Sequence, residues 1–185
     1  MNITQTELTG VLIIELRAFH DPRGYFFEIF QSERYQQHGV PGQFVQDNFS
    51  RSGKNVLRGL HYQLEHPQGK LVFVTYGHVL DVIVDVRSGS STFGKAITIE
   101  LSDQNLRQVY IPPGFAHGFC VLSERADFIY KCTDYYYPAG ERGIYWNDPA
   151  LQIPWPVQDP VLSAKDSVYP CLREVAEDQL PRMTT

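Results

Sequence analysis

The amino-acid sequence predicts a single all-β domain over residues 1–185. Short runs of β-branched and aromatic residues recur along the first three quarters of the chain, with glycine, proline, asparagine and serine between them. Helical periodicity is weak, and the chain contains no internal repeat or linker. Many strands, few helices and one core are typical of a sandwich, a jelly roll or a barrel.

Ten segments carry the strand pattern, in the order 11–16, 25–30, 44–48, 56–64, 71–76, 79–86, 96–101, 108–111, 118–122 and 127–131. Gly77 and His78, between two of these segments, predict a hairpin turn. Helices are expected only at 32–37 and near 171–178. The proline-rich tail from Trp146 onward is expected to wrap over the core without forming a second one.

Composition and charge exclude several classes of protein. The chain is 43% hydrophobic and 13% aromatic, enough for a sizeable core, and its net charge of −5 gives no global basic field for nucleic acid. No run approaches the roughly 20 apolar residues of a membrane span, and no secretory leader is evident. Three cysteines without a CxxC pair argue against a disulfide framework or a structural zinc site. We therefore expect a cytoplasmic protein that binds neither nucleic acid nor membrane.

The segment 56–63 gives the strongest indication of chemistry, because a cation and an imidazole interrupt an apolar, strand-like run. Successive side chains of a strand alternate between its faces, so His61 should share a face with Leu57, and Arg58 should lie on the other. A sheet that buries one face only would not place a histidine in phase with a leucine. Polar groups are therefore expected on both faces of this strand.

Short motifs follow one another along nearly the whole chain. They are 21–28 (DPRGYFFE), 46–48 (QDN), 57–63 (LRGLHYQ), 68–72 (QGKLV), 111–119 (IPPGFAHGF), 130–131 (YK), 146–149 (WNDP) and 162–166 (LSAKD). Each motif alone can arise by chance, whereas all of them in this order cannot. In sequence and order they resemble the dTDP-4-dehydrorhamnose 3,5-epimerases, the cupin-type sugar-nucleotide epimerases of deoxysugar biosynthesis.

The resemblance implies a cupin jelly roll (double-stranded β-helix) with an N-terminal strand extension and a short helical C-terminal tail. It implies a homodimer in which the segment from Arg23 to Glu28 reaches the partner's site, and no cofactor or metal. The implied reaction inverts C3, C5 or both in a nucleoside-diphosphate 4-keto-6-deoxyhexose, foremost dTDP-4-dehydro-6-deoxy-D-glucose to dTDP-4-dehydro-L-rhamnose. Inversion at a single carbon, or a related 4-keto sugar nucleotide, remains open, and so does the nucleobase.

Four residues receive catalytic roles from the resemblance. The C–H bonds at C3 and C5 of a 4-keto sugar are acidic, so inversion needs a base, an acid on the opposite face and stabilisation of the enolate. His61 is the expected base, and Asp166 would fix its tautomer. Tyr130 would donate the opposite proton, since a phenol with a pKa of about 10 stays protonated at neutral pH. Lys70 would oppose the charge on the enolate oxygen.

The resemblance also implies a substrate-binding set. Arg23 and Arg58 would clamp the diphosphate, because guanidinium groups match phosphate oxygens. The other expected substrate-binding residues are Phe26, Glu28, Gln46, Asp47, Asn48, Gln63, His117, Tyr136, Glu141 and Lys165. Phe73 and Tyr76 are expected in the core or the pocket wall, where the family often has polar or basic residues, which leaves the nucleotide and sugar preference open.

Taken alone, several of these residues have ordinary structural explanations. Lys70 could be a solvated lysine that protects an edge strand, and Asp166 could be a turn residue. Tyr130 belongs to an aromatic cluster of the kind that usually serves packing.

Two other kinds of protein compete with the epimerase. A metal-dependent cupin would use His61 and His117, but the expected His-x-His reads His61-Tyr62-Gln63 and no glutamate follows at the usual spacing. Two imidazoles then remain where three protein ligands are usual, so His117 is better interpreted as a pocket residue paired with Asp81. A sugar-nucleotide binder without activity would need no acid and base on opposite sides of its ligand.

Overall fold

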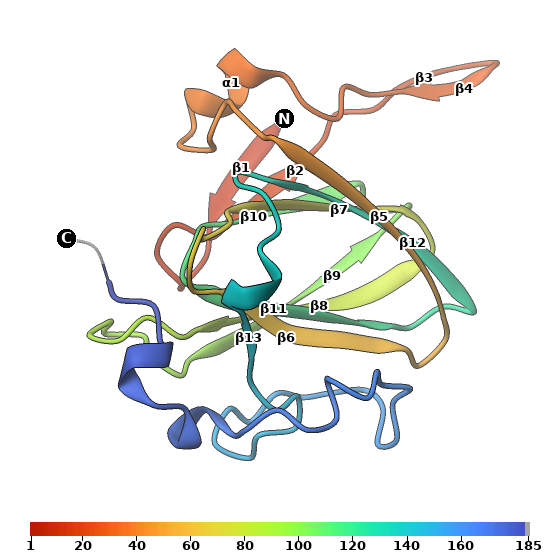
Figure 1. Ribbon diagram of the computed structural model, residues 1–185. Coiled ribbons are helices and arrows are strands. Elements are labelled where there is room, and N and C mark those ends of the chain that lie inside the picture. The colour runs from red at the N-terminus through yellow and green to blue at the C-terminus, as the bar shows by residue number, and fades with distance from the viewer. Residues whose placement is uncertain (184–185) are drawn as a thin grey trace.

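The computed structural model describes residues 1–183 and consists mainly of two antiparallel sheets that face each other (Figure 1). The six-stranded sheet contains, in spatial order, β1 (Asn2–Gln5), β2 (Leu12–Glu15), β10 (Arg107–Ile111), β7 (Lys70–Tyr76), β12 (Arg125–Cys132) and β5 (Gln46–Gly53). The five-stranded sheet contains β13 (Glu141–Gly143), β6 (Leu57–Gln63), β11 (Phe115–Val121), β8 (His78–Asp85) and β9 (Ala96–Ser102). The prediction of an all-β cupin jelly roll is confirmed.

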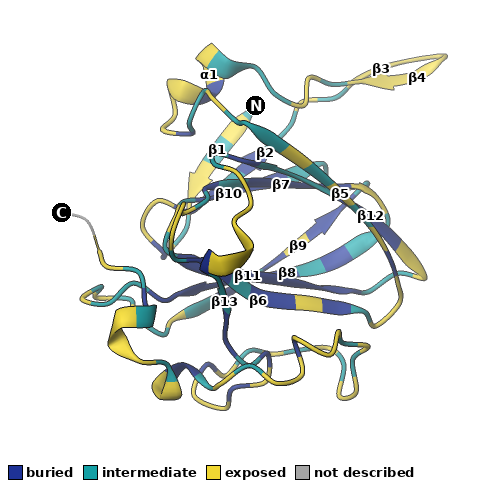
Figure 2. Cartoon of the chain, viewed as in Figure 1, coloured by how far each residue is buried: buried dark blue, intermediate teal, exposed yellow. Residues whose placement is uncertain are grey.

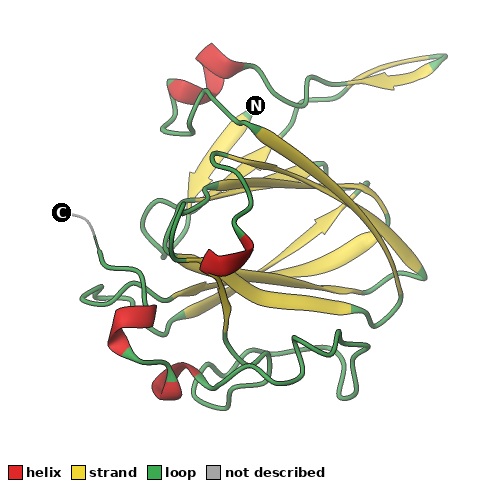
Figure 3. Cartoon of the chain, in the orientation of Figure 1, coloured by secondary structure: helices red, strands yellow, loops and turns green. Residues whose placement is uncertain are grey.

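The remaining elements lie outside the two sheets (Figure 3). They are the hairpin of β3 (Phe19–Asp21) and β4 (Gly24–Phe26), the helix α1 (Ser32–Gln36), and the 3₁₀ turns η1 (Pro138–Gly140), η2 (Leu172–Glu174) and η3 (Glu177–Gln179). The helix expected near 171–178 is therefore two short turns, because Val175 and Ala176 between them are extended. None of the helices within residues 1–183 has the length and hydropathy needed to cross a membrane.

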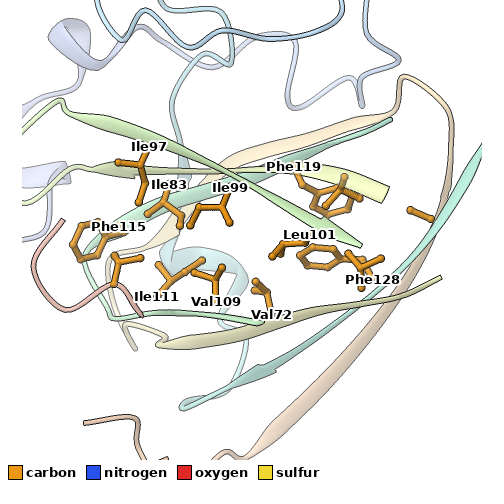
Figure 4. Packing of buried hydrophobic residues seen from close by; sticks show 14 of the residues in the cluster. Val72, Ile83, Ile97, Ile99, Leu101, Val109, Ile111, Phe115, Phe119 and Phe128 are labelled. Atoms are coloured by element: carbon orange, nitrogen blue, oxygen red, sulfur yellow. The ribbon is translucent and has the colours of Figure 1, made fainter. Parts of the chain in front are cut away.

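The main core fills the space between the sheets (Figure 4). Alternate residues of facing strands supply it, as the two-residue period of a strand requires. The rings of Phe119 on β11 and Phe128 on β12 stack with centroids 4.2 Å apart and an interplanar angle of 12°. Because β11 and β12 belong to different sheets, this stack fixes the separation of the sheets next to the cavities described below.

The outer faces of both sheets are covered by the ends of the chain. Leu151, Leu172 and Leu180 of the C-terminal tail pack with Val82 and Val84 of β8, so the prediction that the tail wraps over the core is confirmed. On the other side, the segment around α1 buries an apolar cluster against β2 and β10. Each sheet is thus covered on part of its outer face as well as on its inner face.

The predicted hairpin at Gly77 and His78 is wrong. β7 pairs with β10 and β12, whereas β8 pairs with β11 and β9, so the chain crosses between the sheets at this point. Val74 of β7 and Val79 of β8, on either side of this crossing, belong to the same core cluster. A tight turn between two strands predicts their proximity, but a glycine with a φ of +84° can equally redirect the chain into the opposite layer.

The predicted distribution of side chains along β6 is also wrong. Leu57 packs with Trp146 on the outer side of the sheet, whereas Arg58 and His61 line the same cavity on the inner side. Strict alternation would place Arg58 and His61 on opposite faces. The strand must therefore change phase between them.

A β-bulge at Gly59 causes this change of phase. His117 pairs with His61 and Phe119 with Arg58, so two residues of β6 oppose the single Gly118 of β11. Gly59 has a φ of +131°, and a Cβ on it would lie 2.5 Å from the Cα of Gly118. Only glycine fits this contact, and the bulge that it permits turns Arg58 and His61 into one cavity.

Substitution of Gly59 should therefore destabilise the protein far more than substitution of another strand glycine. We expect Gly59→Ala to lower the free energy of unfolding by on the order of 2 to 4 kcal/mol, because it combines a left-handed φ with a backbone clash. Gly53→Ala is the matched control, since its Cβ would meet nothing closer than 4.0 Å, and it should cost less than about 1 kcal/mol. Urea unfolding of both variants tests this, and equal losses would contradict it.

Candidate active site

Two adjoining cavities of about 340 and 440 Å³ open between the sheets. His61, Lys70 and Tyr130 line both of them. His61 belongs to β6 of the five-stranded sheet, whereas Lys70 on β7 and Tyr130 on β12 belong to the six-stranded sheet. Figure 1 shows that these two sheets lie opposite each other. A ligand that occupies both cavities therefore has the imidazole on one side and the ammonium and phenol on the other.

His61 and Asp166 form a close pair although 105 residues separate them in the chain. Nε2 of His61 lies 2.6 Å from Oδ1 of Asp166. The Asp166 side chain is only 4% exposed, while that of His61 is 24% exposed toward the cavity. The backbone N–H of Asp166 donates to Oγ of Ser163, which anchors the loop that carries the carboxylate. A turn thus contains Asp166, but its side chain is directed at the histidine.

Protonation of the pair follows from its surroundings. Burial acts to raise the pKa of Asp166, but hydrogen bonds from His61, Ser163 and the backbone of Gly59 outweigh it, so this pKa lies below its ordinary value. The carboxylate can only accept, so the proton of the neutral imidazole is assigned to Nε2. Nδ1 then carries the lone pair and is the basic atom of the ring.

Lys70 is a half-buried cation in the middle of a sheet. β7 lies between β10 and β12, so the interpretation of Lys70 as an edge-strand lysine is wrong. Burial lowers the pKa of Lys70, and the nearby Cys132, Glu141 and Asp81 oppose this effect. Side-chain alternation along β7 directs Lys70 into both cavities, where its donors can meet an anionic ligand atom.

Tyr130 is placed to act as a proton donor. Burial raises the pKa of its phenol above the ordinary value. The hydroxyl group therefore keeps its proton at neutral pH and faces the cavities from the sheet opposite His61.

A second histidine–aspartate pair lies deeper in the second cavity. Nε2 of His117 is 2.7 Å from Oδ2 of Asp81, which confirms the predicted pairing. Asp81 is completely buried, and burial raises its pKa. Its other oxygen, Oδ1, accepts no hydrogen bond from residues 1–183. His117 lines only the second cavity, so it can contact a ligand there but not one in the first cavity.

The histidines do not form a metal site. Each of the two has Nε2 engaged by its own carboxylate. Within the part of the chain that the structure describes, no three His, Cys, Asp or Glu side chains lie close enough together to hold a metal ion. The residues present therefore do not fit the ligand set of a mononuclear cupin metal centre.

Polar side chains line much of the rest of the cavities. Nε of Arg58 donates to Oγ of Ser52 at 3.0 Å, which orients the guanidinium toward the second cavity. Glu141 accepts hydrogen bonds from Tyr136 and Lys165, each at 2.8 Å. Of the residues predicted from the sequence to bind substrate, these line one or other cavity: Gln46, Asn48, Arg58, Gln63, His117, Tyr136, Glu141 and Lys165.

Four predicted binding residues line neither cavity. Asp47 lies on the outer face of β5, because Gln46 and Asn48 on either side of it point inward. Its Oδ2 lies 2.9 Å from Nζ of Lys131. The other three are Arg23, Phe26 and Glu28, which lie on or just after the projecting hairpin of β3 and β4 (Figure 2). The motif 21–28 is intact, but none of its residues lines the two cavities of this chain.

The prediction that Phe73 and Tyr76 lie in the core or the pocket wall is confirmed for Phe73 and wrong for Tyr76. Neither residue lines either cavity, because the alternation that directs Lys70 inward directs Phe73 outward. Phe73 is buried against Phe27 on the outer face of the sheet, so its assignment to the core holds. Tyr76 is 49% exposed and lies under the guanidinium of Arg125, so it is neither core nor pocket wall.

Gln68, Ser50 and Ser163 are polar residues of the cavities that received no role from the sequence. Gln68 and Ser163 lie inside the motifs 68–72 and 162–166, so their place in those motifs is the signal that could have identified them. Ser50 continues the inward alternation of Gln46 and Asn48 along β5. Its Oγ is buried and has no hydrogen-bond partner among residues 1–183, so it is available to a ligand of the second cavity.

Comparison with known proteins agrees with the family resemblance of the sequence motifs. The family model described as dTDP-4-dehydrorhamnose 3,5-epimerase matches residues 5–174. A dTDP-4-dehydrorhamnose 3,5-epimerase of Shigella flexneri is 53% identical over 168 residues, which are 90% of this chain and 93% of that protein.

Solved structures are similarly close. The dTDP-6-deoxy-D-glucose-3,5-epimerase of Legionella pneumophila, in complex with dTDP-4-keto-L-rhamnose, has a TM-score of 0.95 and 50% identity, and the match covers 100% of this chain and 99% of that one. A 3'-monoepimerase of Streptomyces bikiniensis, in complex with dTDP-quinovose, has a TM-score of 0.90 and 34% identity, with 96% of this chain and 91% of that one covered.

Proposed function

This chain belongs to the dTDP-4-dehydrorhamnose 3,5-epimerase family, and from that membership we propose that it inverts C3 and C5 of dTDP-4-dehydro-6-deoxy-D-glucose to give dTDP-4-dehydro-L-rhamnose. One observation carries the proposal. His61, paired with Asp166, and the half-buried Tyr130 face the same cavities from opposite sheets. Inversion at carbon requires this arrangement, because the proton must leave from one face and return to the other.

The proposed first step is removal of a proton by His61. The hydrogen bond from Nε2 to Asp166 leaves Nδ1 as the basic atom. Nδ1 takes the proton from the carbon next to the C4 carbonyl, and the electron pair of the broken C–H bond moves onto the carbonyl oxygen as an enolate. Asp166 stabilises the imidazolium that forms, as a carboxylate does in other histidine-based catalysts.

Lys70 is proposed to stabilise the enolate oxygen. Its ammonium is held by β7 in a half-buried position between the sheets, where electrostatic interactions are stronger than in water. Removal of such a donor typically raises the barrier by on the order of 3 kcal/mol. A lowered pKa also permits Lys70 to share its proton with the enolate more readily than a solvated lysine would.

Tyr130 is proposed to complete the inversion. The enolate collapses to the ketone as its carbon takes the phenolic proton on the face opposite His61. The imidazolium and the phenolate then exchange protons with solvent, so the reaction is an isomerisation without net gain or loss of atoms. Each of these steps is a proton transfer, and the proposal routes none of them through a metal or a cofactor.

Inversion at one carbon only is the alternative that a specific observation favours. The relative from Streptomyces bikiniensis is a 3'-monoepimerase with a TM-score of 0.90 to this chain. C3 and C5 both flank the C4 carbonyl, so one base and one acid can serve either carbon once the sugar ring is turned. Deuterium from solvent marks each carbon that has been deprotonated and thereby separates the two possibilities.

Incubation with the 4-keto substrate in deuterated water should place deuterium at both C3 and C5. His61→Ala should lower this incorporation by at least about a hundredfold, because it removes the base. Adding Asp166→Asn to His61→Ala should cause little further loss, since the two residues act as one unit. Mass spectrometry and NMR of the recovered sugar nucleotide provide the measurement, and near wild-type exchange by His61→Ala would refute the mechanism.

Tyr130→Phe should separate exchange from inversion. The substitution removes one oxygen and keeps the ring, so the fold should persist while the donor on the far face is lost. His61 can still remove and return a proton on its own face, so deuterium should enter with retention of configuration. Formation of the L-configured product should fall by roughly a hundredfold or more, and equal inversion rates for Tyr130→Phe and wild type would reduce Tyr130 to a wall of the cavity.

A homodimer is proposed because part of the expected binding set projects away from the body of the chain. The hairpin exposes Tyr25 and Phe26, and Phe26 is 69% exposed. Beside it, an apolar groove on the outer face of the six-stranded sheet is lined by Phe27, Phe73 and Ile129 among others. Exposed aromatic side chains next to an apolar groove are typical of a subunit interface. We propose that the segment from Arg23 to Glu28 completes the site of a second copy.

Mixing two defective variants tests the proposed exchange of segments. If Arg23 serves the partner's site, coexpression of Arg23→Ala with His61→Ala yields mixed dimers in which one site has both residues intact. Half of all dimers are mixed, so about a quarter of wild-type activity should return. If Arg23 serves its own chain, every site keeps one lesion and coexpression restores nothing.

The proposed location is the cytoplasm. All three cysteines are free thiols, with Cys120 and Cys132 buried and Cys171 partly exposed. Free thiols without a disulfide are typical of a reducing compartment.

A further inference from the structure

A tyrosine of the C-terminal tail packs against the proposed base. The rings of Tyr169 and His61 meet edge to face, with centroids 5.7 Å apart and an interplanar angle of 66°. Tyr169 lines neither of the two cavities, so it is not placed to touch a bound sugar. A hydrogen bond of 2.7 Å from the N–H of Tyr145 to the carbonyl of Pro170 holds the adjoining segment in place.

Gly143 makes room for this ring. It pairs directly with His61 across β13 and β6. A Cβ on Gly143 would lie 2.5 Å from Cε2 and 2.6 Å from Cζ of Tyr169. The aromatic ring therefore occupies the space that a side chain at position 143 would fill, directly beside the histidine backbone.

The hydrogen bond to Asp166 is not sufficient to orient the imidazole. It fixes one atom of the ring, Nε2, while the torsion about the Cβ–Cγ bond of a histidine is broad and costs little to change. A ring held at one atom can tilt about it and swing Nδ1 away from the cavity. A second contact on the side of the ring removes this freedom, and Tyr169 supplies that contact.

We infer that Tyr169 is a positioning residue that holds the plane of His61 and so aims Nδ1 at the reacting carbon. This inference rests on the proposed function of His61 as the base. A displacement of about 1 Å in a reacting group can cost on the order of a hundredfold in rate. Loss of the Tyr169 ring should therefore act on kcat rather than on substrate binding.

Substitution of Tyr169 tests the inference. Tyr169→Ala should lower kcat by at least about tenfold and leave KM within about twofold of wild type. Tyr169→Phe keeps the ring and should restore most of kcat, which shows that packing rather than the hydroxyl group matters. Val168→Ala, at a neighbouring residue that is 77% exposed, is the control for a general effect on the loop. Thermal unfolding of all variants checks that they are folded.

A second substitution disturbs the contact between Tyr169 and His61 without removing the tyrosine. Gly143→Ala should displace the Tyr169 ring and lower kcat in the wild-type background. In the Tyr169→Ala background the same substitution meets no ring, so it should cause little further loss. Independent losses from the two substitutions would overturn the inference.

The outcomes distinguish this inference from the proposed function. Wild-type kcat in Tyr169→Ala, or a change in KM alone, would overturn the positioning role while His61→Ala remained inactive. Full activity in His61→Ala would instead overturn the proposed base and the inference with it. A low kcat in Tyr169→Phe equal to that of Tyr169→Ala would assign the effect to the hydroxyl group and also overturn the positioning role.

Discussion

The contact between the backbones of Gly59 and Gly118 is the constraint on which the site depends. These two glycines approach so closely that a Cβ on either one would overlap the other strand. Their contact permits the bulge in β6, and the bulge directs Arg58 and His61 into the same cavity. Without it, alternation would send the expected phosphate ligand and the proposed base to opposite faces of the sheet. A strained position in the backbone thus produces the arrangement of polar groups that the chemistry needs.

The opposition of acid and base follows from the two-layer architecture. His61 and Tyr130 belong to different sheets, and the space between the sheets is filled by a core that includes the stacked rings of Phe119 and Phe128. A packed core resists compression, so the proposed donor and acceptor keep their separation. The fold therefore supplies the two-sided environment that inversion at carbon requires. Of the four proposed catalytic residues, Asp166 alone lies outside the strands.

The sequence predicts this site unevenly, for physical reasons. Strand segments and the motif residues that line the cavities could be predicted because both are local patterns. The phase change at Gly59 could not be predicted, because a bulge depends on the partner strand. The crossing between sheets at Gly77 could not be predicted either, because it depends on which strands pair. Asp166 came only from family resemblance, because 105 residues separate it from His61. Tyr169 belongs to no motif, and its contact exists only where the tail returns to β13.

The two histidine–aspartate pairs show why identical chemistry in one cavity does not give identical roles. Asp81 is completely buried and burial raises its pKa, whereas hydrogen bonds lower the pKa of Asp166 despite its burial. A carboxylate of lowered pKa is the better partner for an imidazole that must become charged during turnover. His61 also lines both cavities, while His117 lines one. Electrostatics and position therefore both favour His61 as the base and leave His117 to contact the ligand.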